Sequence, residues 1–563
     1  MDEKLSDKDN LINNEINNNN LINNFENNNI IENDNIIQTN NIIFQNDNEN
    51  LFHLEYLNSK NKQIVPIIII FQKNELNIYQ NDLIILSKNY NDIISIKFEE
   101  DILNDDIINL KKNNKIKEEI LENKIFFQLN LISLNKKINN SCLNCFCCCC
   151  KSNNIVKERK FLTFNFLINK NLKYQLYEKF SYYLPTSFLK EIISNNRKMK
   201  LLIFVNPASG TGQAINTYNK ALPLLNKGNV TTRVVFTEYK NHAYDYVQNL
   251  KINEYDGIIV CSGDGIMHEI INSIFNRNDK DIFINNIILG VIPGGSANAL
   301  CKVISNYNDD NNDLENFIYY ILKGNSKYID IQEYELLTEQ NVSKKIYSFL
   351  SLTWGIIADI DLESECLRCL GGEARFTIMG AIRWLWLREI YGNLMILKED
   401  SNVNINDIPS IKENLSDEFI SNNMEVFNDK FNLFLANNTK FISENNYTNP
   451  LSELDDGKND ILFLKNSDSG KFLLFKELVY YLDDGDMLFS DKDKKEFING
   501  IHYKKCKFFR LIPKINLTQN NDVNVSVLNN FTFNYSIDGE KYPICPIQCK
   551  TLNRVIRIFS AKE

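Results

Sequence analysis

Runs of apolar residues alternate with polar turns across residues 196–326, in the order expected for strands that alternate with helices. Short apolar stretches of strand length precede longer stretches with helical spacing. The predicted strands are 201–207, 231–238, 256–265 and 286–295, and the predicted helices are 214–225, 242–250 and 267–275. This alternation is typical of a parallel sheet, whose ligand-binding loops lie at the carboxyl ends of the strands.

Strand patterns dominate on both sides of this α/β segment. On the N-terminal side, strands are predicted at 64–71, 76–86, 93–100, 125–135 and 157–168, followed by an amphipathic helix at 171–184. On the C-terminal side they are predicted at 327–337, 344–355, 431–437, 460–466, 506–517 and 530–540. Strands closed by one helix follow the order of a pleckstrin-homology-like barrel, and an ordinary β-rich accessory domain has the same pattern. The later strands predict a second, antiparallel domain.

Asparagine-rich tracts interrupt these patterns. Residues 1–50 bury too few apolar side chains to offset chain entropy, so this segment is predicted to be disordered. Similar tracts at 309–312, 401–424 and 437–449 are predicted to be loop expansions that carry no chemistry. An amphipathic helix is predicted at 471–482, either packed in the core or bordering a lipid pocket or bilayer.

The amino-acid composition limits the kinds of partner that the chain can bind. The 62 Lys and Arg against 72 Asp and Glu give a net charge of −10, which argues against a general nucleic-acid binder. No apolar run reaches the roughly 18 residues needed to span a bilayer, and MDEKLSDKDN has no apolar signal region, so we expect a cytoplasmic chain with reduced thiols. The Cys run at 141–150 is either buried and idle or reversibly acylated at a membrane surface.

Three glycine-containing turns end three of the predicted strands. NPASGTGQA (206–214) offers backbone N–H groups at Ser209–Gly212 before a helix, an arrangement that can hold phosphate or simply close a tight connection. It lacks the Lys of a Walker A loop. PGGSANA (293–299) offers a similar group of amides. At one sheet edge the turns together are far more specific than any one of them.

The remaining turn, SGDGIMHE (262–269), places Asp264 between two glycines where a strand meets a helix. Asp264 could cap its own helix, since Asp favours that position. However, a cap does not require a glycine on both sides. Gly263 and Gly265 remove bulk around the carboxylate, as a group that approaches a substrate requires.

These turns resemble the signature blocks of lipid kinases with a diacylglycerol-kinase-type catalytic domain. The block FLSLTWGIIADIDLESECLRCLGGEARFTIMG (349–380) is similar to sphingosine (long-chain-base) kinases, and YSIDGE (535–540) continues the resemblance. It implies an NAD-kinase-like α/β nucleotide domain (196–326) and a C-terminal antiparallel β-sandwich lipid domain (327–563) with a low-complexity insert near 400–426. The region 51–195 more loosely resembles the pleckstrin-like part of plant-type long-chain-base kinases.

The resemblance also implies site residues, with ATP and Mg²⁺ as cofactors and the metal ligands unassigned. Asp264 would be the catalytic base for the lipid hydroxyl. Nucleotide contacts are implied for Asn206, Pro207, Ala208, Ser209, Gly210, Thr237, Glu238, Tyr239, Lys240, Asn241, Glu269, Gly295, Ser296, Ala297, Arg368, Arg375, Asp538, Gly539 and Glu540. Lipid contacts are implied for Ser262, Gly263, Asp264, Gly265, Ser351 and Asp361. Arginine suits phosphate because guanidinium pairs with it bidentately.

Two departures from the family pattern concern this site. Ala297 stands where a second glycine is common, and LGGEAR has an extra glycine, so the placement of Arg375 depends on the alignment. Asp359 is interpreted as part of a solvated acidic turn. Residues without an implied role are expected in the core or at helix ends (His242 and His268), and in the core or a lipid-pocket wall (Trp384 and Trp386).

The function indicated is transfer of the ATP γ-phosphate to the primary hydroxyl of sphingosine and related sphingoid bases. A ceramide or diacylglycerol kinase is the alternative within enzymes, and an inactive membrane adaptor with a kinase-like fold is the alternative outside them. The expected partners are the sphingoid base and a membrane surface contacted peripherally, without nucleic acid. A homodimer is left open.

Overall fold

The computed structural model describes the strand segments 51–57, 64–71, 75–80, 83–89, 93–98, 124–138 and 155–169, and residues 197–562 apart from 296, 365, 368–371, 389, 466–487, 491–495, 499 and 515–533. The chain forms two compact units. The first contains the strands before Lys198, and the second contains the residues from Met199 onward, apart from 223–230 and 322–324. The segment 1–50, the Cys run 141–150, and the helices predicted at 171–184 and 471–482 lie outside the described residues.

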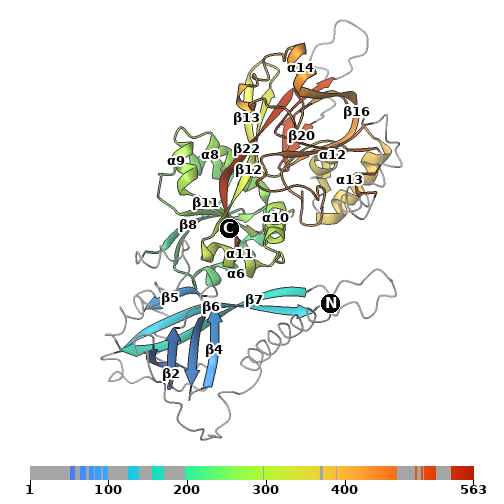
Figure 1. Cartoon of the computed structure of the whole chain (residues 1–563). Coiled ribbons are helices and arrows are strands. Elements are labelled where there is room, and N and C mark those ends of the chain that lie inside the picture. The colour runs from blue at the N-terminus through green and yellow to red at the C-terminus, as the bar shows by residue number, and fades with distance from the viewer. Residues whose placement is uncertain are drawn as a thin grey trace, which may run out of the picture. The chain divides into compact units, whose positions relative to one another are not determined.

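The first unit is a seven-stranded antiparallel sheet in the order β4-β3-β2-β1-β7-β6-β5 (Figure 1). Its strands are β1 (Leu51–Leu57), β2 (Ile64–Phe71), β3 (Glu75–Gln80), β4 (Leu83–Asn89), β5 (Ile93–Phe98), β6 (Lys124–Ile138) and β7 (Ile155–Asn169). Two meanders, β1 to β4 and β5 to β7, are joined because β1 pairs with β7. The predicted strands are confirmed, with 76–86 divided into β3 and β4, and β1 was not predicted. A pleckstrin-like barrel stays a prediction.

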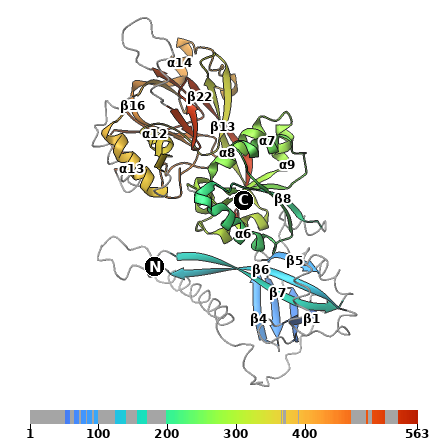
Figure 2. The same ribbon diagram turned by 180° about the vertical axis from the view of Figure 1, so that it is seen from behind.

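The α/β part of the second unit is built on β8 (Met199–Val205), β9 (Val230–Phe236), β10 (Gly257–Ser262) and β11 (Ile288–Pro293). Strand β10 pairs in parallel with both β8 and β11. The helices are α6 (Gln213–Leu225), α7 (His242–Gln248), α8 (Asp264–Phe275), α9 (Lys280–Asn286), α10 (Ala299–Tyr307) and α11 (Leu314–Lys323). Figures 1 and 2 show α8 and α9 on one face of these strands and α6 on the other. The predicted alternation of strands and helices is confirmed.

The antiparallel part contains β12 (Ser326–Leu337), β13 (Ser343–Ser348), β14 (Ser351–Gly355), β15 (Ile390–Leu397), β16 (Met424–Asn437), β17 (Asn459–Lys465), β18 (Ile501–Cys506), β19 (Phe508–Lys514), β20 (Asn534–Ile537), β21 (Glu540–Pro543) and β22 (Ile547–Phe559). Its helices are α12 (Ile356–Glu363), α13 (Gly372–Leu385) and α14 (Asp417–Asn423). The buried Trp354 packs against the rings of Phe431, Phe434 and Tyr535 at its centre. None of the described helices is both long and apolar enough to cross a bilayer.

Strand β22 connects the two parts of this unit. It pairs in parallel with β11 at Leu289↔Ile558 and antiparallel with β12 and β19. The strands therefore belong to one hydrogen-bonded network of 15 strands. An α/β part followed by an antiparallel β part was predicted and is confirmed. The C-terminal antiparallel sandwich stays a prediction, and β22 continues its strands into the parallel sheet.

Two predictions for the C-terminal half need correction. The single strand predicted at 344–355 is divided into β13 and β14 at Phe349 and Leu350, where the amides turn toward the Asp538 carboxylate. The tract at 401–424 is more than a loop, since it includes α14 and buries Ile408 and Leu415.

After Asn437, the last residue of β16, the tract at 437–449 contains no helix or strand and only an isolated bridge between Phe441 and Tyr447, but it is not a simple surface expansion. Asn437, Asn438 and Asn449 are fully buried. The side-chain amide of Asn438 donates to the Asp330 carbonyl at 2.7 Å, and that of Asn449 donates to the Asp460 carbonyl at 3.2 Å. Asparagine here satisfies buried backbone groups, as buried polar side chains must.

Candidate active site

The three glycine-containing turns meet at the carboxyl edge of β8, β10 and β11. The Gly263 amide donates to Ser209 Oγ at 3.1 Å, which joins the first turn to the second. A β-carbon built on Gly295 would lie 2.2 Å from Gly263 Cα, so the second and third turns touch backbone to backbone. These contacts confirm the prediction that the turns share one edge.

The first turn has a shape set by Asn206. Its Oδ1 accepts from the Ala208 amide at 3.0 Å, and its carbonyl accepts from the Ser209 amide at 3.1 Å. Such side-chain bonds stabilise turns led by Asn. The chain then passes through a short 3-10 helix (Ser209–Gly212) into α6. The unpaired amides and dipole of a helix N-terminus favour anions.

Asp264 is the first residue of α8, but its carboxylate caps a different helix. Oδ2 accepts from the Ala299 amide at 2.9 Å and Oδ1 from the Leu300 amide at 3.0 Å, both at the start of α10. The first amides of a helix lack partners within it, so this carboxylate satisfies two of them. The alternative that Asp264 caps α8 is therefore not what the structure has, because Gly263 occupies that position.

The surroundings of Asp264 strengthen it as a proton acceptor. Burial raises the pKa of the Asp264 carboxyl, and the two amide bonds only partly oppose that rise. The nearby Asp538 charge raises the pKa further. Each carboxylate oxygen has a second lone pair, so either can still accept a proton-bearing group.

Glu269 plays the same capping role for α7. Its Oε1 accepts from the Asn241 amide at 2.8 Å, and its Oε2 accepts from the Ala243 amide at 3.2 Å. Burial raises the pKa of Glu269 despite these bonds. The carboxylate thereby fixes the left-handed turn at Asn241, whose φ is 70°, and with it the segment Thr237–Asn241. Within that segment the exposed Tyr239 ring stacks on His242.

The C-terminal motif DGE (538–540) contacts the second turn and the segment Thr237–Asn241. Lys240 Nζ lies 2.8 Å from Glu540 Oε2. A β-carbon built on Gly265 would lie 3.0 Å from Glu540 Oε1, so this glycine leaves room for the Glu540 carboxylate. The two segments predicted to contact nucleotide, 237–241 and 538–540, are thus neighbours of residues 263–265, which were predicted to contact lipid.

Asp538 and Gly539 form the tight turn of the β20–β21 hairpin. Both have positive φ, 52° and 83°, as the two central residues of a type I′ turn require, and Asp-Gly is a preferred pair for it. The Asp538 side chain is buried rather than open to a ligand. Its Oδ1 accepts from Ser348 Oγ at 2.6 Å and from the Leu350 and Ser351 amides at 3.0 and 3.1 Å. The residue expected to contact nucleotide therefore holds the start of β14 in place.

The residues predicted to contact lipid lie on neighbouring elements. Ser351 begins β14, which pairs with β20 at Thr353↔Ser536. Asp361 lies on α12, and its Oδ2 accepts from Ser536 Oγ at 2.5 Å. Strand β20 thus links the two predicted residues. Ser262, at the end of β10, is buried.

Asp359 is not the solvated residue that the sequence indicated. It is buried on α12, with Arg388 Nη1 3.4 Å from its Oδ1. Burial raises its pKa to about 6, although the Arg388 charge opposes the rise. Asp359 and Asp361 thus differ in environment although they are neighbours in sequence.

The predicted phosphate-binding arginines are only partly covered by the structure. Arg368 and Ser296 lie outside the described residues. Arg375 lies on α13, is 8% exposed, and has its guanidinium carbon 4.4 Å from the centroid of the Phe376 ring. Its role as a phosphate clamp stays a prediction. Trp386 is 67% exposed, so a core position is wrong for it.

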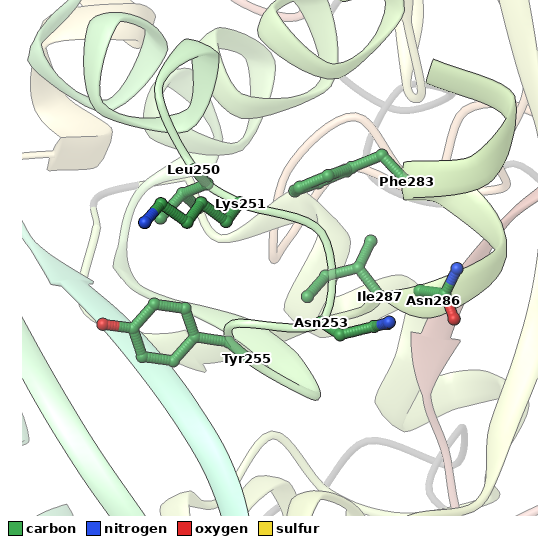
Figure 3. Close-up of a pocket in the computed structure, with 7 residues that line it drawn as sticks. All are labelled: Leu250, Lys251, Asn253, Tyr255, Phe283, Asn286 and Ile287. Atoms are coloured by element: carbon green, nitrogen blue, oxygen red, sulfur yellow. The ribbon is translucent and has the colours of Figure 1, made fainter. Parts of the chain in front are cut away.

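A pocket on another part of the α/β segment has no part in this site. It has a volume of about 210 Å³ and is lined by Leu250, Lys251, Asn253, Tyr255, Phe283, Asn286 and Ile287 (Figure 3). Tyr255 lies two residues before β10 and Ile287 one residue before β11, so the pocket lies at the amino edge of the sheet. The glycine turns are at the carboxyl edge.

Mg²⁺, implied by the family resemblance, has no ligand set of its own among the described residues. No group of three or more His, Cys, Asp or Glu side chains there is arranged to hold a metal ion. The carboxylates of Asp264, Glu269 and Asp538 bind backbone amides. Mg²⁺ stays a prediction without an assigned ligand.

Comparisons with known proteins show what the chain is similar to. Residues 200–334 match the family model described as the diacylglycerol kinase catalytic domain. The chain is 32% identical to sphingosine kinase 1 of Arabidopsis thaliana over 37% of this chain and 42% of that protein. It is 28% identical to sphingoid long chain base kinase 4 of Schizosaccharomyces pombe over 63% of this chain and 73% of that protein. A solved diacylglycerol kinase of Bacillus anthracis str. Sterne aligns with 64% of this chain and 97% of its own, at 18% identity and a TM-score of 0.43.

The fold and the site thus define the class: residues 200–334 contain an α/β domain whose glycine turns converge at one edge of the sheet. These residues are similar to the diacylglycerol kinase catalytic domain. The resemblance to sphingosine and long-chain-base kinases is also confirmed. The match spans less than half the length of the Arabidopsis relative.

Several residues of the site were not found from the sequence. His268, expected only in the core or at a helix end, bonds Asp538 and Tyr542. Ser536 bonds Asp361. Asn298, which has a left-handed φ of 46°, accepts from the Gly295 amide at 2.8 Å and shapes the third turn. Of these, only Asn298 could have been found from the local sequence, since Asn tolerates the left-handed conformation. The other side chains bond residues that are far away in sequence.

Proposed function

We propose that this chain is an ATP-dependent lipid kinase that phosphorylates the primary hydroxyl of sphingosine and related sphingoid bases. One observation carries the proposal. A carboxylate, Asp264, lies where three glycine-containing turns converge, with its two oxygens oriented by the amides of α10. Phosphoryl transfer depends mostly on positioning and charge stabilisation, and this arrangement supplies both.

In this proposal the turns hold the triphosphate and Asp264 receives the proton. Amides at the starts of α6 and α8 favour phosphate oxygens. The lipid hydroxyl donates its hydrogen bond to the free lone pair of one Asp264 oxygen, and its oxygen attacks the γ-phosphorus as the bond to ADP breaks. The raised pKa of Asp264 makes it a better base than an exposed carboxylate.

Asp361 and Ser351 are the proposed contacts to the lipid head group. Asp361 is a carboxylate on α12 that is held by Ser536, and Ser351 lies on the strand that pairs with β20. A carboxylate suits a substrate with a free ammonium group, which sphingoid bases have and ceramide and diacylglycerol lack. The names of the relatives point to the same substrate class.

Helix α13 supports the proposed peripheral contact with a membrane. Ile378, Ile382, Leu385 and Trp386 are all exposed apolar side chains at its surface or end. Their spacing places Ile378, Ile382 and Leu385 on one side of the helix. Cosedimentation with lipid vesicles is expected for the wild type and to weaken in Trp386→Gln; an unchanged bound fraction would contradict the contact.

The substrate assignment is tested by phosphate transfer from γ-labelled ATP to sphingosine, dihydrosphingosine, phytosphingosine, ceramide and diacylglycerol. Label is expected in the sphingoid bases and not in ceramide or diacylglycerol. Label mainly in diacylglycerol would favour the activity named by the family model. Asp281→Asn is an exposed change on α9, away from the turns, and controls for a general effect of replacing Asp by Asn. This variant should label the same lipids as wild type. No label in any lipid would overturn the proposal.

A further inference from the structure

Helix α8 is joined to the segment Tyr347–Ser351 in two ways, directly at Tyr347 and through Asp538 at Phe349–Ser351. Asn272 Nδ2 donates to the Tyr347 carbonyl at 2.8 Å, and its Oδ1 accepts from the Tyr347 amide at 2.9 Å. The Phe275 ring stacks on the Tyr347 ring with centroids 4.2 Å apart. These contacts fix the second half of the helix. The first half, which begins with Asp264, is held differently.

His268 makes the connection for the first half of α8. Its ring is buried, with Nδ1 2.8 Å from Asp538 Oδ2 and Nε2 2.8 Å from the Tyr542 hydroxyl. A carboxylate only accepts hydrogen bonds, so Nδ1 carries the proton and donates to Asp538. In the neutral ring, Nε2 then accepts from Tyr542. Both polar atoms of the buried side chain are therefore satisfied.

The partner of His268 is also the acceptor that shapes the Ser351 turn. Asp538 receives the amides of Phe349, Leu350 and Ser351, at 3.3, 3.0 and 3.1 Å. These amides lie at the break between β13, which pairs with β12, and β14, which pairs with β16 and β20. The Asp538 carboxylate supplies their acceptor at this break. Asp538 thus joins α8 to the chain that carries Ser351.

His268 follows Asp264 by about one helical turn, and residues at this spacing lie on the same side of a helix. The Asp538 charge raises the pKa of Asp264, which agrees with the closeness of the two carboxylates. A shift of α8 against β14 would therefore change the distance between Asp264 and Ser351. His268 is the side chain that opposes this shift at the Asp264 end.

We propose that His268 is a positioning residue whose Nδ1–H bond to Asp538 holds Asp264 at a fixed place relative to the Ser351 turn. This inference rests on the proposed function, in which Asp264 is the base and Ser351 contacts the lipid. Misplacing a reacting group by about 1 Å can lower a rate about 10²-fold. The effect should fall on kcat, since the His268 ring bonds Asp538 and Tyr542 rather than the amides proposed to hold the phosphates.

Three variants separate the Asp538 bond from the bulk of the ring. In His268→Asn, the side-chain amide can take the place of Nδ1 and donate to Asp538. In His268→Gln, the longer side chain reaches toward Tyr542 instead, and His268→Ala makes neither bond. Tyr542→Phe is the matched control, because it removes only the bond at Nε2.

We expect kcat for sphingosine to fall about 10- to 100-fold in His268→Ala and His268→Gln, with KM for ATP within about threefold of wild type. His268→Asn should recover most of this loss, and Tyr542→Phe should lose little. Equal losses in His268→Asn and His268→Gln would overturn the role of the Asp538 bond. A raised KM for ATP with unchanged kcat would overturn the positioning role.

Hydrogen exchange at the Phe349–Ser351 amides gives a readout independent of activity. Exchange there should be faster in His268→Ala than in wild type, and close to wild type in His268→Asn. Unchanged exchange in His268→Ala would overturn the inference even if activity falls. If wild type phosphorylates no lipid, the proposed function fails, and the exchange comparison still decides whether His268 holds this turn.

Discussion

The contact between Gly263 and Gly295 predicts an asymmetric response to two similar substitutions. In Gly295→Ala, the new methyl group would lie 2.2 Å from Gly263 Cα and 2.6 Å from Gly263 N, both backbone atoms. In Gly263→Ala, the nearest atoms are Gly295 Cα at 3.4 Å and Ser209 Oγ at 3.6 Å. Gly263 also has an ordinary extended conformation, with φ −82°. The same methyl group therefore clashes on one side of the contact and fits on the other.

The magnitude follows from the distances. Carbon atoms pack at about 3.5–4.0 Å, so the two turns in Gly295→Ala must separate by more than about 1 Å. Overpacking of this kind destabilises a protein by about 1–3 kcal/mol, and the upper end is expected because neither neighbour is a flexible side chain. A displacement of about 1 Å at a reacting site lowers activity about 10²-fold. Gly263→Ala should lose less than about 1 kcal/mol and keep activity within a few-fold.

Urea denaturation and steady-state phosphorylation of sphingosine measure these two effects on wild type and both variants. We expect Gly263→Ala to be close to wild type in both stability and kcat, and Gly295→Ala to be well below both proteins. If Gly295→Ala keeps wild-type stability and activity, the turns do not touch as described. If Gly263→Ala is damaged as severely, the asymmetry is wrong.

Two further predictions concern α12. Asp361→Asn should raise KM for sphingosine about tenfold or more with little change in KM for ATP, because a neutral amide attracts an ammonium group less than a carboxylate does; a defect confined to ATP would contradict its lipid role. Asp359 has a folded pKa raised from 3.8 to about 6, so its ionisation above pH 6 disfavours the folded state by up to about 3 kcal/mol. Asp359→Asn should therefore have a higher free energy of unfolding than wild type at pH 7.5, reduced by the loss of the Arg388 contact. This difference should shrink as the pH falls through 6 toward 4. Urea denaturation of both proteins at pH 7.5 and pH 4 measures this difference. A stability advantage of Asp359→Asn that grows at pH 4 would refute the prediction.

The sequence was sufficient where the signal is local. Continuous apolar runs predicted β8, β10 and β11, and the glycines that follow them predicted turns at a common edge. It was insufficient where a side chain serves a distant element. Nothing near Asp264 in sequence indicates that it caps α10, and nothing near Phe349 indicates that Asp538 interrupts the strand there.

Burial was also hard to judge from residue type. Asp359 and the asparagines at 437–449 were interpreted as solvated because such residues usually are. Two of these side chains have a partner brought close only by the fold: Arg388 for the Asp359 carboxylate and the Asp330 carbonyl for the Asn438 side-chain nitrogen. Polarity predicts exposure only when no such partner exists.

The most direct test of the account is the rate of phosphate transfer to sphingosine by Asp264→Asn at saturating ATP and lipid. The variant should lose about 10²- to 10⁴-fold in kcat, as expected when a general base is removed. Because the Asn amide would face an N–H of α10, ATP binding and the melting curve must show that the variant is folded. A folded, ATP-binding Asp264→Asn that still phosphorylates sphingosine at a near-wild-type rate would contradict the account.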